Sequence, residues 1–190
     1  TDFKETVKRA YRRDPWQTQP QLIEVWLEKD ALSGIFEVEL EPYRVILNVG
    51  RGYDGWSSIR NASVRYAEWD RVTILYFGDF DPSGEDMTRS LKERLGFFDC
   101  YPEVKKIALA GEDILTYNLP PDFAKKTDTR AKKFIEQNGD ISVELDALPV
   151  AVLRERIRKE IEARLDMNAL EKAKQLEGKE RLIIEEMIGR

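Results

Sequence analysis

Short apolar runs alternate with amphipathic stretches between Leu22 and Ala110. Runs rich in β-branched and aromatic residues are typical of strands, whereas apolar positions three and four residues apart are typical of helices. These patterns predict strands at residues 22–27, 44–49, 72–77 and 104–110. Between them they predict helices at residues 29–39, 57–69 (capped by Ser57 or Ser58) and 82–96 (capped by Asp81). This alternation predicts an α/β fold, a mainly parallel sheet with helices on both faces.

The pattern is looser after Ala110. The elements predicted there are a helix opened by Thr127 or Asp128, a half-buried strand at 141–148, an amphipathic helix at 150–165 and a charged helical tail at 168–188. A short basic helix is expected within residues 2–13. The predicted organisation is an N-terminal arm (1–20), an α/β domain (21–148) and a C-terminal helical extension (149–190).

Composition places the chain among globular proteins. Of its 190 residues, 42% are hydrophobic and 35% are charged, which is too apolar for a disordered chain. No apolar run is long enough to span a bilayer and residues 1–20 show no signal-peptide pattern, so no membrane partner is expected. The single cysteine, Cys100, excludes an intrachain disulfide and fits a cytoplasmic location. The net charge of −5 argues weakly against non-specific nucleic-acid binding.

The chain contains no histidine. This excludes Ser-His-Asp and Cys-His catalysis, histidine-ligated zinc and imidazole general bases. Acid–base or metal chemistry in this chain therefore has to rest on Asp, Glu, Lys, Arg or Tyr side chains.

The segment that follows the predicted strand at 72–77 carries the strongest chemical signal. Asp79 and Asp81 lie two residues apart, and the period of two along an extended chain places both on one side. Two neighbouring carboxylates are costly to ionise together unless a cation lies between them. Mg²⁺ prefers oxygen ligands, and Mn²⁺ is its ordinary substitute, so the pair predicts a metal site for phosphate chemistry.

Three loops contribute to the same predicted edge of the sheet. Glu28, Arg51 and the Asp79–Asp81 pair each come just after a predicted strand. Because sites in parallel sheets form at the carboxyl ends of the strands, these side chains are expected to converge.

Residues 78–84, Gly-Asp-Phe-Asp-Pro-Ser-Gly, together with Glu28 after an earlier strand, resemble the Toprim domain of topoisomerases, bacterial primases, recombination mediators and related nucleases. The resemblance covers about residues 21–148. The closest version is that of the topoisomerase VI A subunit and its meiotic double-strand-break relatives, which residues 143–148 also resemble. Residues 26–32 and 126–132 further resemble uncharacterised Toprim-like proteins of prokaryotes and phages.

The resemblance implies a role for each matching position. Asp79 and Asp81 would hold Mg²⁺, and Glu28 would complete the metal site or act as the general acid–base. DNA, or less specifically nucleic acid, would be the substrate. The side chains expected to contact its backbone are Arg51, Lys126, Arg130 and Lys132; those expected to hold a second metal or to support the first are Glu85, Glu144 and Asp146.

Three functions follow from this resemblance. Direct cleavage of a phosphodiester by a metal-dependent nuclease is the simplest. A topoisomerase VI-like transesterase would instead need its tyrosine on an upstream winged-helix domain or subunit, for which the roughly twenty preceding residues are too few. A non-catalytic adaptor that binds nucleic acid is the third. A homodimer is compatible with all three.

Each assignment also has a purely structural explanation. Asp81 caps a helix in any case, although capping leaves Asp79 unexplained. Glu28 is favoured by the dipole of the helix that follows it, and Gly-Arg-Gly around Arg51 is a common turn. The basic residues near Arg130 are typical of a solvated helix face. Glu144 and Asp146 are typical of a solvent-exposed strand face.

Overall fold

The computed structural model describes residue 6 and residues 10–50, 55–122 and 130–189. The chain forms two compact units: residues 21–164, and residues 1–20 together with 165–190. The larger unit contains the sheet and every residue of the candidate site.

The larger unit is built on a four-stranded, all-parallel sheet in the order β2-β1-β3-β4. The strands are β1 (Leu22–Leu27), β2 (Ile46–Val49), β3 (Val72–Phe77) and β4 (Glu103–Ala108). β1 and β3 pair along their whole length, and both are buried at every position. Burial on both faces explains their continuous apolar sequences, and the predicted α/β class with a parallel sheet is confirmed.

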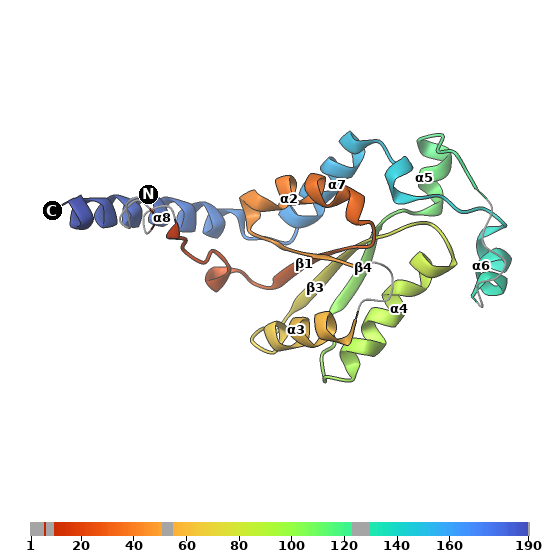
Figure 1. The fold of residues 1–190 in the computed structure, drawn as a ribbon, viewed down its shortest axis with the longest axis horizontal. Helices are drawn as coiled ribbons and strands as arrows, with labels where there is room; N and C mark the ends of the chain where they lie inside the picture. Colours follow the sequence, from red (N-terminus) through yellow and green to blue (C-terminus); the bar gives the residue numbers. More distant parts are fainter. Residues whose placement is uncertain (1–5, 7–9, 51–54, 123–129, 190) are drawn as a thin grey trace. The chain divides into compact units, whose positions relative to one another are not determined.

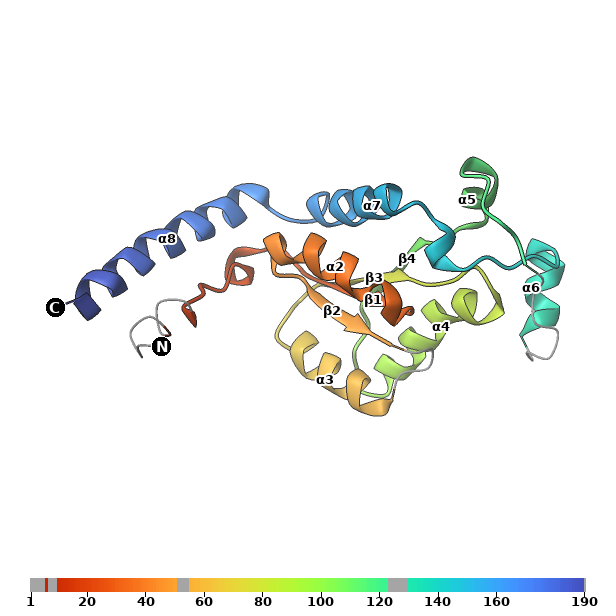
Figure 2. The same cartoon turned by 45° about the horizontal axis from the view of Figure 1, so that its top comes forward.

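Helices cover both faces of the sheet (Figures 1 and 2). The helix α2 (Ser33–Leu40) and the helix α7 (Val150–Glu162) pack together on one face, while α3 (Trp56–Tyr66) and α4 (Pro82–Gly96) lie on the other. This division follows from the right-handedness of the crossover connections between parallel strands. The crossover from β1 to β2 runs in the opposite direction to those that lead to β3 and β4, and right-handed crossovers then place their helices on opposite faces.

The remaining elements of the larger unit are short. The helices α5 and α6 cover Gly111–Thr116 and Ala131–Asn138, and single 3-10 turns occur at Asp30–Leu32, Glu41–Tyr43 and Leu145–Ala147. Beneath α2 the core contains a T-shaped contact between Phe36 and Phe77, with ring centroids 4.9 Å apart.

Several predicted boundaries need correction. β2 begins at Ile46 rather than at Arg44, whose φ of 53° is left-handed and cannot continue a strand. The helix α3 begins at Trp56 after Gly55, and no serine side chain caps it. The helix expected from Thr127 or Asp128 begins at Ala131, the preceding residues lying outside the described part of the chain.

The strand predicted at residues 141–148 is wrong. Only isolated antiparallel bridges form there, from Val143 to Phe80 and from Ser142 to Asp122, and the chain then turns through the 3-10 helix at Leu145–Ala147. The bridging partners Phe80 and Asp122 lie outside the strands of the sheet, and the described residues contain no neighbouring strand along which the pairing extends. Val143 and Leu145 are nevertheless buried, which explains the alternating pattern.

The smaller unit is organised around the long helix α8 (Met167–Gly189). The 3-10 turn η1 (Trp16–Thr18) packs against α8, and Gln19 exchanges hydrogen bonds with the backbone of Asp166. In the described residues, no helix has both the length and the apolar content needed to cross a membrane. The basic helix expected within residues 2–13 falls mostly outside the described part of the chain.

A buried carboxylate connects the elements on one face of the sheet. Glu24, in the middle of β1, has no exposed surface. It accepts hydrogen bonds from Arg65 Nε at 2.7 Å, from the Tyr66 hydroxyl at 2.8 Å and from Asn48 Nδ2 at 2.7 Å. Burial and the charge of Glu24 raise the pKa of Tyr66, so its hydroxyl remains a donor. This network joins α3 and β2 to the central strand.

Replacing Glu24 by alanine is expected to lower the free energy of unfolding by about 3 kcal/mol, because Arg65 and Asn48 then lose a buried acceptor. Chemical denaturation followed by circular dichroism measures the change. The exposed Glu37→Ala substitution on α2 is the control and should change stability by less than about 0.5 kcal/mol. Equal effects of the two substitutions would show that the network does not stabilise the fold.

Candidate active site

The candidate site lies where the direction of the sheet connections reverses. From β1 the chain crosses to β2 on one side, whereas from β3 it crosses to β4 on the other, although β1 and β3 are neighbours. Open α/β sheets bind ligands at the carboxyl ends of the strands on either side of this reversal. Glu28 follows β1 and Asp79 follows β3, and the Glu28 amide donates to Phe77 O at 2.9 Å.

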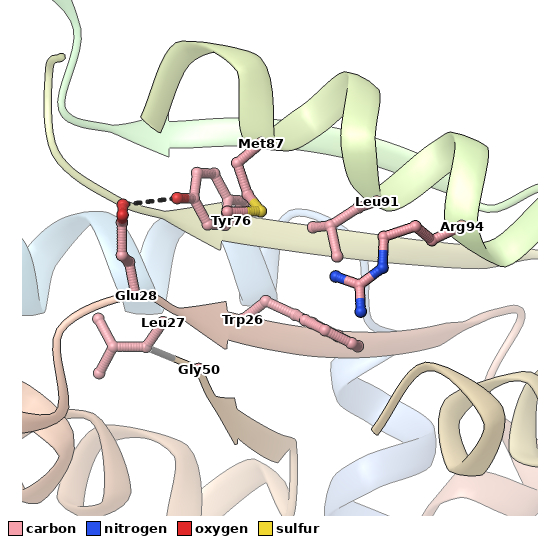
Figure 3. Close-up of a pocket in the computed structure, with 8 residues that line it drawn as sticks. All are labelled: Trp26, Leu27, Glu28, Gly50, Tyr76, Met87, Leu91 and Arg94. Carbon is pink, nitrogen blue, oxygen red and sulfur yellow. Dashed lines mark hydrogen bonds between the residues drawn. The ribbon is translucent and has the colours of Figure 1, made fainter. Parts of the chain in front are cut away.

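Glu28 is held in place by β3 and its loop. Its Oε2 accepts a hydrogen bond from the Tyr76 hydroxyl at 2.7 Å, drawn in Figure 3, and another from the Asp79 amide at 3.2 Å. Burial and the nearby charge of Glu28 raise the pKa of Tyr76, which keeps its hydroxyl protonated. A side chain at Gly78 would collide with this pair, because a Cβ there would lie 2.1 Å from the Tyr76 hydroxyl.

Asp79 is half-buried between two other segments of the chain. Its Oδ1 accepts a hydrogen bond from the Leu145 amide at 2.7 Å, and its carbonyl oxygen accepts one from Lys106 Nζ at 2.7 Å. Burial raises the pKa of Asp79 to about 6; the Leu145 hydrogen bond opposes this rise, and the charges of Glu28 and Asp81 add to it. The site thus holds an accumulation of negative charge.

Asp81 caps α4, as predicted. Its Oδ1 accepts a hydrogen bond from the Gly84 amide at 2.6 Å, and Pro82 occupies the first turn of the helix. The absence of a side chain at Gly84 is a second requirement of this loop, because a Cβ there would lie 2.2 Å from the carbonyl oxygen of Asp79.

The predicted carboxylates do not all line the same space. Asp79 and Asp81 line a cavity of about 500 Å³, together with Glu144 and Asp146. Glu28 lines a separate pocket of about 10 Å³, roughly the room of one water molecule, between the sheet and α4 (Figure 3). The Glu28 carboxylate thus meets Asp79 at the backbone amide of Asp79, which donates the hydrogen bond described above.

Lys29 neutralises two of the carboxylates predicted as support for a metal. Its Nζ lies 2.9 Å from Glu144 and 2.6 Å from Asp146, on the turn that also supplies the Leu145 amide to Asp79. These acidic residues are not on a solvent-exposed strand face, because the strand does not form. They connect the end of β1 to the turn that orients Asp79.

The other predicted site residues that the structure describes have separate partners or are exposed. Glu85 forms an ion pair with Lys106 at 2.6 Å. Arg130 lies 3.7 Å from Asp86, and Lys132 is exposed on α6. Arg51 and Lys126 lie outside the described residues.

Whether these carboxylates can bind Mg²⁺ depends on how many of them lie close together. Within residues 10–50, 55–122 and 130–189, no three Asp, Glu or Cys side chains are arranged so that they could hold a metal ion. Mg²⁺ often takes only one or two protein carboxylates, with waters and substrate phosphates as its other ligands. Asp79 and Asp81 line one cavity, as a site of this kind requires. The residues therefore fit a two-carboxylate site, and Glu28 as a third ligand remains a prediction.

The sequence patterns did not identify several residues that shape the site. Tyr76 belongs to an apolar strand and gave no separate signal, and Lys29 lies in a charged helix start where one lysine does not stand out. Lys106 lies on β4, where nothing in the sequence indicates that it reaches the carbonyl oxygen of Asp79. The Leu145 amide is a backbone group, so no side-chain motif could reveal its role.

Models of known protein families and curated proteins were compared with the chain, and neither comparison found a match. Any assignment of function therefore depends on the fold and on the geometry of this site.

Replacing Gly84 by alanine is expected to displace the Asp79 loop and to destabilise the protein by about 1–3 kcal/mol, because the new methyl group would overlap a backbone oxygen. Gly34→Ala in the first turn of α2 is the matched control, since a Cβ at that position would have open space within 4 Å. That control should be neutral or slightly stabilising. Thermal denaturation of both variants checks the prediction, and equal melting temperatures would contradict it.

Proposed function

We propose that the larger unit is a Toprim-like domain that catalyses Mg²⁺-dependent phosphoryl transfer on nucleic acid, most simply cleavage of a DNA phosphodiester. The observation that supports this proposal is the position of Glu28, Asp79 and Asp81 at the carboxyl ends of two adjacent strands, where the sheet connections reverse direction. This placement agrees with the resemblance of residues 78–84 to Toprim sequences.

Each acidic residue has a distinct part in the proposed chemistry. Asp79 and Asp81 would hold the ion, and bound Mg²⁺ would supply positive charge that neutralises the phosphate and stabilises the leaving oxygen. The Leu145 amide and the cap to Gly84 fix the directions of the two carboxylates. Glu28, held by Tyr76, accepts or returns a proton, a task that the absence of histidine leaves to a carboxylate.

One observation favours a second function, that of a non-catalytic adaptor for nucleic acid. In the described residues no three acidic side chains meet at one point, and Glu28 lines a different pocket from Asp79 and Asp81. An adaptor of this fold would bind nucleic acid without needing a metal.

The nuclease proposal predicts that the chain nicks supercoiled plasmid in the presence of Mg²⁺ or Mn²⁺. Asp79→Asn and Asp81→Asn should each reduce the rate by at least about a hundredfold, because each removes a charged ligand of the metal. Agarose electrophoresis of the plasmid over time measures the rates.

Asp70→Asn is the matched control, because Asp70 is an exposed carboxylate that precedes β3 at the opposite edge of the sheet. This variant should nick at the wild-type rate. Plasmid that stays intact with the wild-type chain, while a gel shift shows bound DNA, would reject the nuclease and support the adaptor. If both variants still nick the plasmid, the nicking activity belongs to a contaminant or to another site.

A further inference from the structure

An exposed aromatic cluster lies on the helices that cover the site's face of the sheet. Trp56 begins α3, and its ring contacts Phe97 and Phe98, which follow the last turn of α4, at centroid distances of 5.4 and 6.3 Å. The guanidinium of Arg94 lies over the Trp56 ring, 5.4 Å from its centroid. We call these four residues the aromatic platform.

Two aromatic side chains of the platform are largely exposed to solvent. Trp56 is 53% exposed and Phe97 is 75% exposed, whereas Tyr66 and Tyr76 on the same side of the sheet are almost fully buried. Clustered exposed aromatic residues usually mark a binding surface rather than a part of the core.

Charge indicates what kind of ligand the platform suits. The helix α3 carries two arginines and no acidic residue; Arg65 is paired with the buried Glu24, which leaves the charge of Arg60. Arg60 lies one helical turn from Trp56 and is exposed. Exposed aromatic rings with an arginine nearby form a surface on which unpaired bases can stack while a backbone phosphate meets positive charge.

The platform and the candidate active site lie at the two ends of α4. Arg94 lines the same small pocket as Glu28, and Figure 3 shows Tyr76, Met87 and Leu91 between them. The helix α4 runs from the Asp81 cap to the platform, and its 15 residues span about 22 Å. A short single strand is long enough to reach from one end of this helix to the other.

We propose that the aromatic platform binds unpaired bases of single-stranded nucleic acid, with Trp56 and Phe97 as the stacking surfaces, Arg94 as the support of the Trp56 ring and Arg60 as the contact to phosphate. This inference deepens the proposed function, since it names the single-stranded part of the substrate. It does not need the metal, so it can be tested separately from cleavage.

The test measures binding of a fluorescently labelled oligothymidylate of about 15 nucleotides by anisotropy, in EDTA and at low salt. Trp56→Ala and Phe97→Ala should each weaken binding at least about fivefold, because each removes a stacking surface. Trp56→Phe should retain much of the affinity. A blunt duplex of equal length, whose bases are already stacked, should bind the wild type and both alanine variants equally.

Leu115→Ala is the control for loss of an exposed apolar side chain, since Leu115 on α5 is 88% exposed and should not affect binding. Wild-type affinity in both alanine variants, or no binding by the wild type, would overturn the proposal. Unchanged binding together with altered sedimentation of the alanine variants would identify the platform as a protein interface. Because binding is measured in EDTA and nicking needs the metal, failure of the platform and failure of the nuclease give different results.

Discussion

β1 and β3 pair in parallel along their whole length, from Leu22 with Val72 to Leu27 with Phe77. This register brings Glu28 beside the backbone of Asp79, because Glu28 is the first residue after β1 and Asp79 the second after β3. A slip of one residue would turn every side chain of a strand to the opposite face, and in β1 it would remove Glu24 from its buried hydrogen-bond partners. The candidate chemistry therefore depends on the packing of the two central strands.

Two lysines outside the Asp79–Asp81 segment balance part of the negative charge near the site. Lys29 pairs with Glu144 and Asp146, and Lys106 reaches both Glu85 and the carbonyl oxygen of Asp79. Asp79 remains with a raised pKa because burial outweighs the help of the Leu145 amide. The protein thus compensates the surrounding acids, whereas the two central aspartates share a cavity in which a cation would lower their mutual repulsion.

Two surfaces with different chemistry lie at the two ends of α4. Its first turn is capped by Asp81 and belongs to the acidic cavity, and its last turn leads into the exposed aromatic platform. Cleavage of nucleic acid needs both electrostatic control of a phosphate and a means of positioning the chain. The proposed division assigns the first task to Asp79 and Asp81 and the second to Trp56 and Phe97.

Sequence alone was sufficient where the signal was local. The apolar runs predicted β1 and β3 to the residue, and Asp81 before Pro82 predicted the start of α4, because burial on both faces and helix capping act on adjacent residues. The alternation at 141–148 was misleading, since the same pattern arises when two apolar side chains anchor a loop that has no neighbouring strand.

Only the tertiary structure decided which groups meet. The Tyr76 hydroxyl on Glu28, the Leu145 amide on Asp79 and the two ion pairs of Lys29 join segments between about fifty and more than a hundred residues apart. The separation of Glu28 and the aspartates into different pockets has the same origin. Such contacts depend on the path of the whole chain and on the directions of individual side chains, and neither leaves a periodic pattern in the sequence.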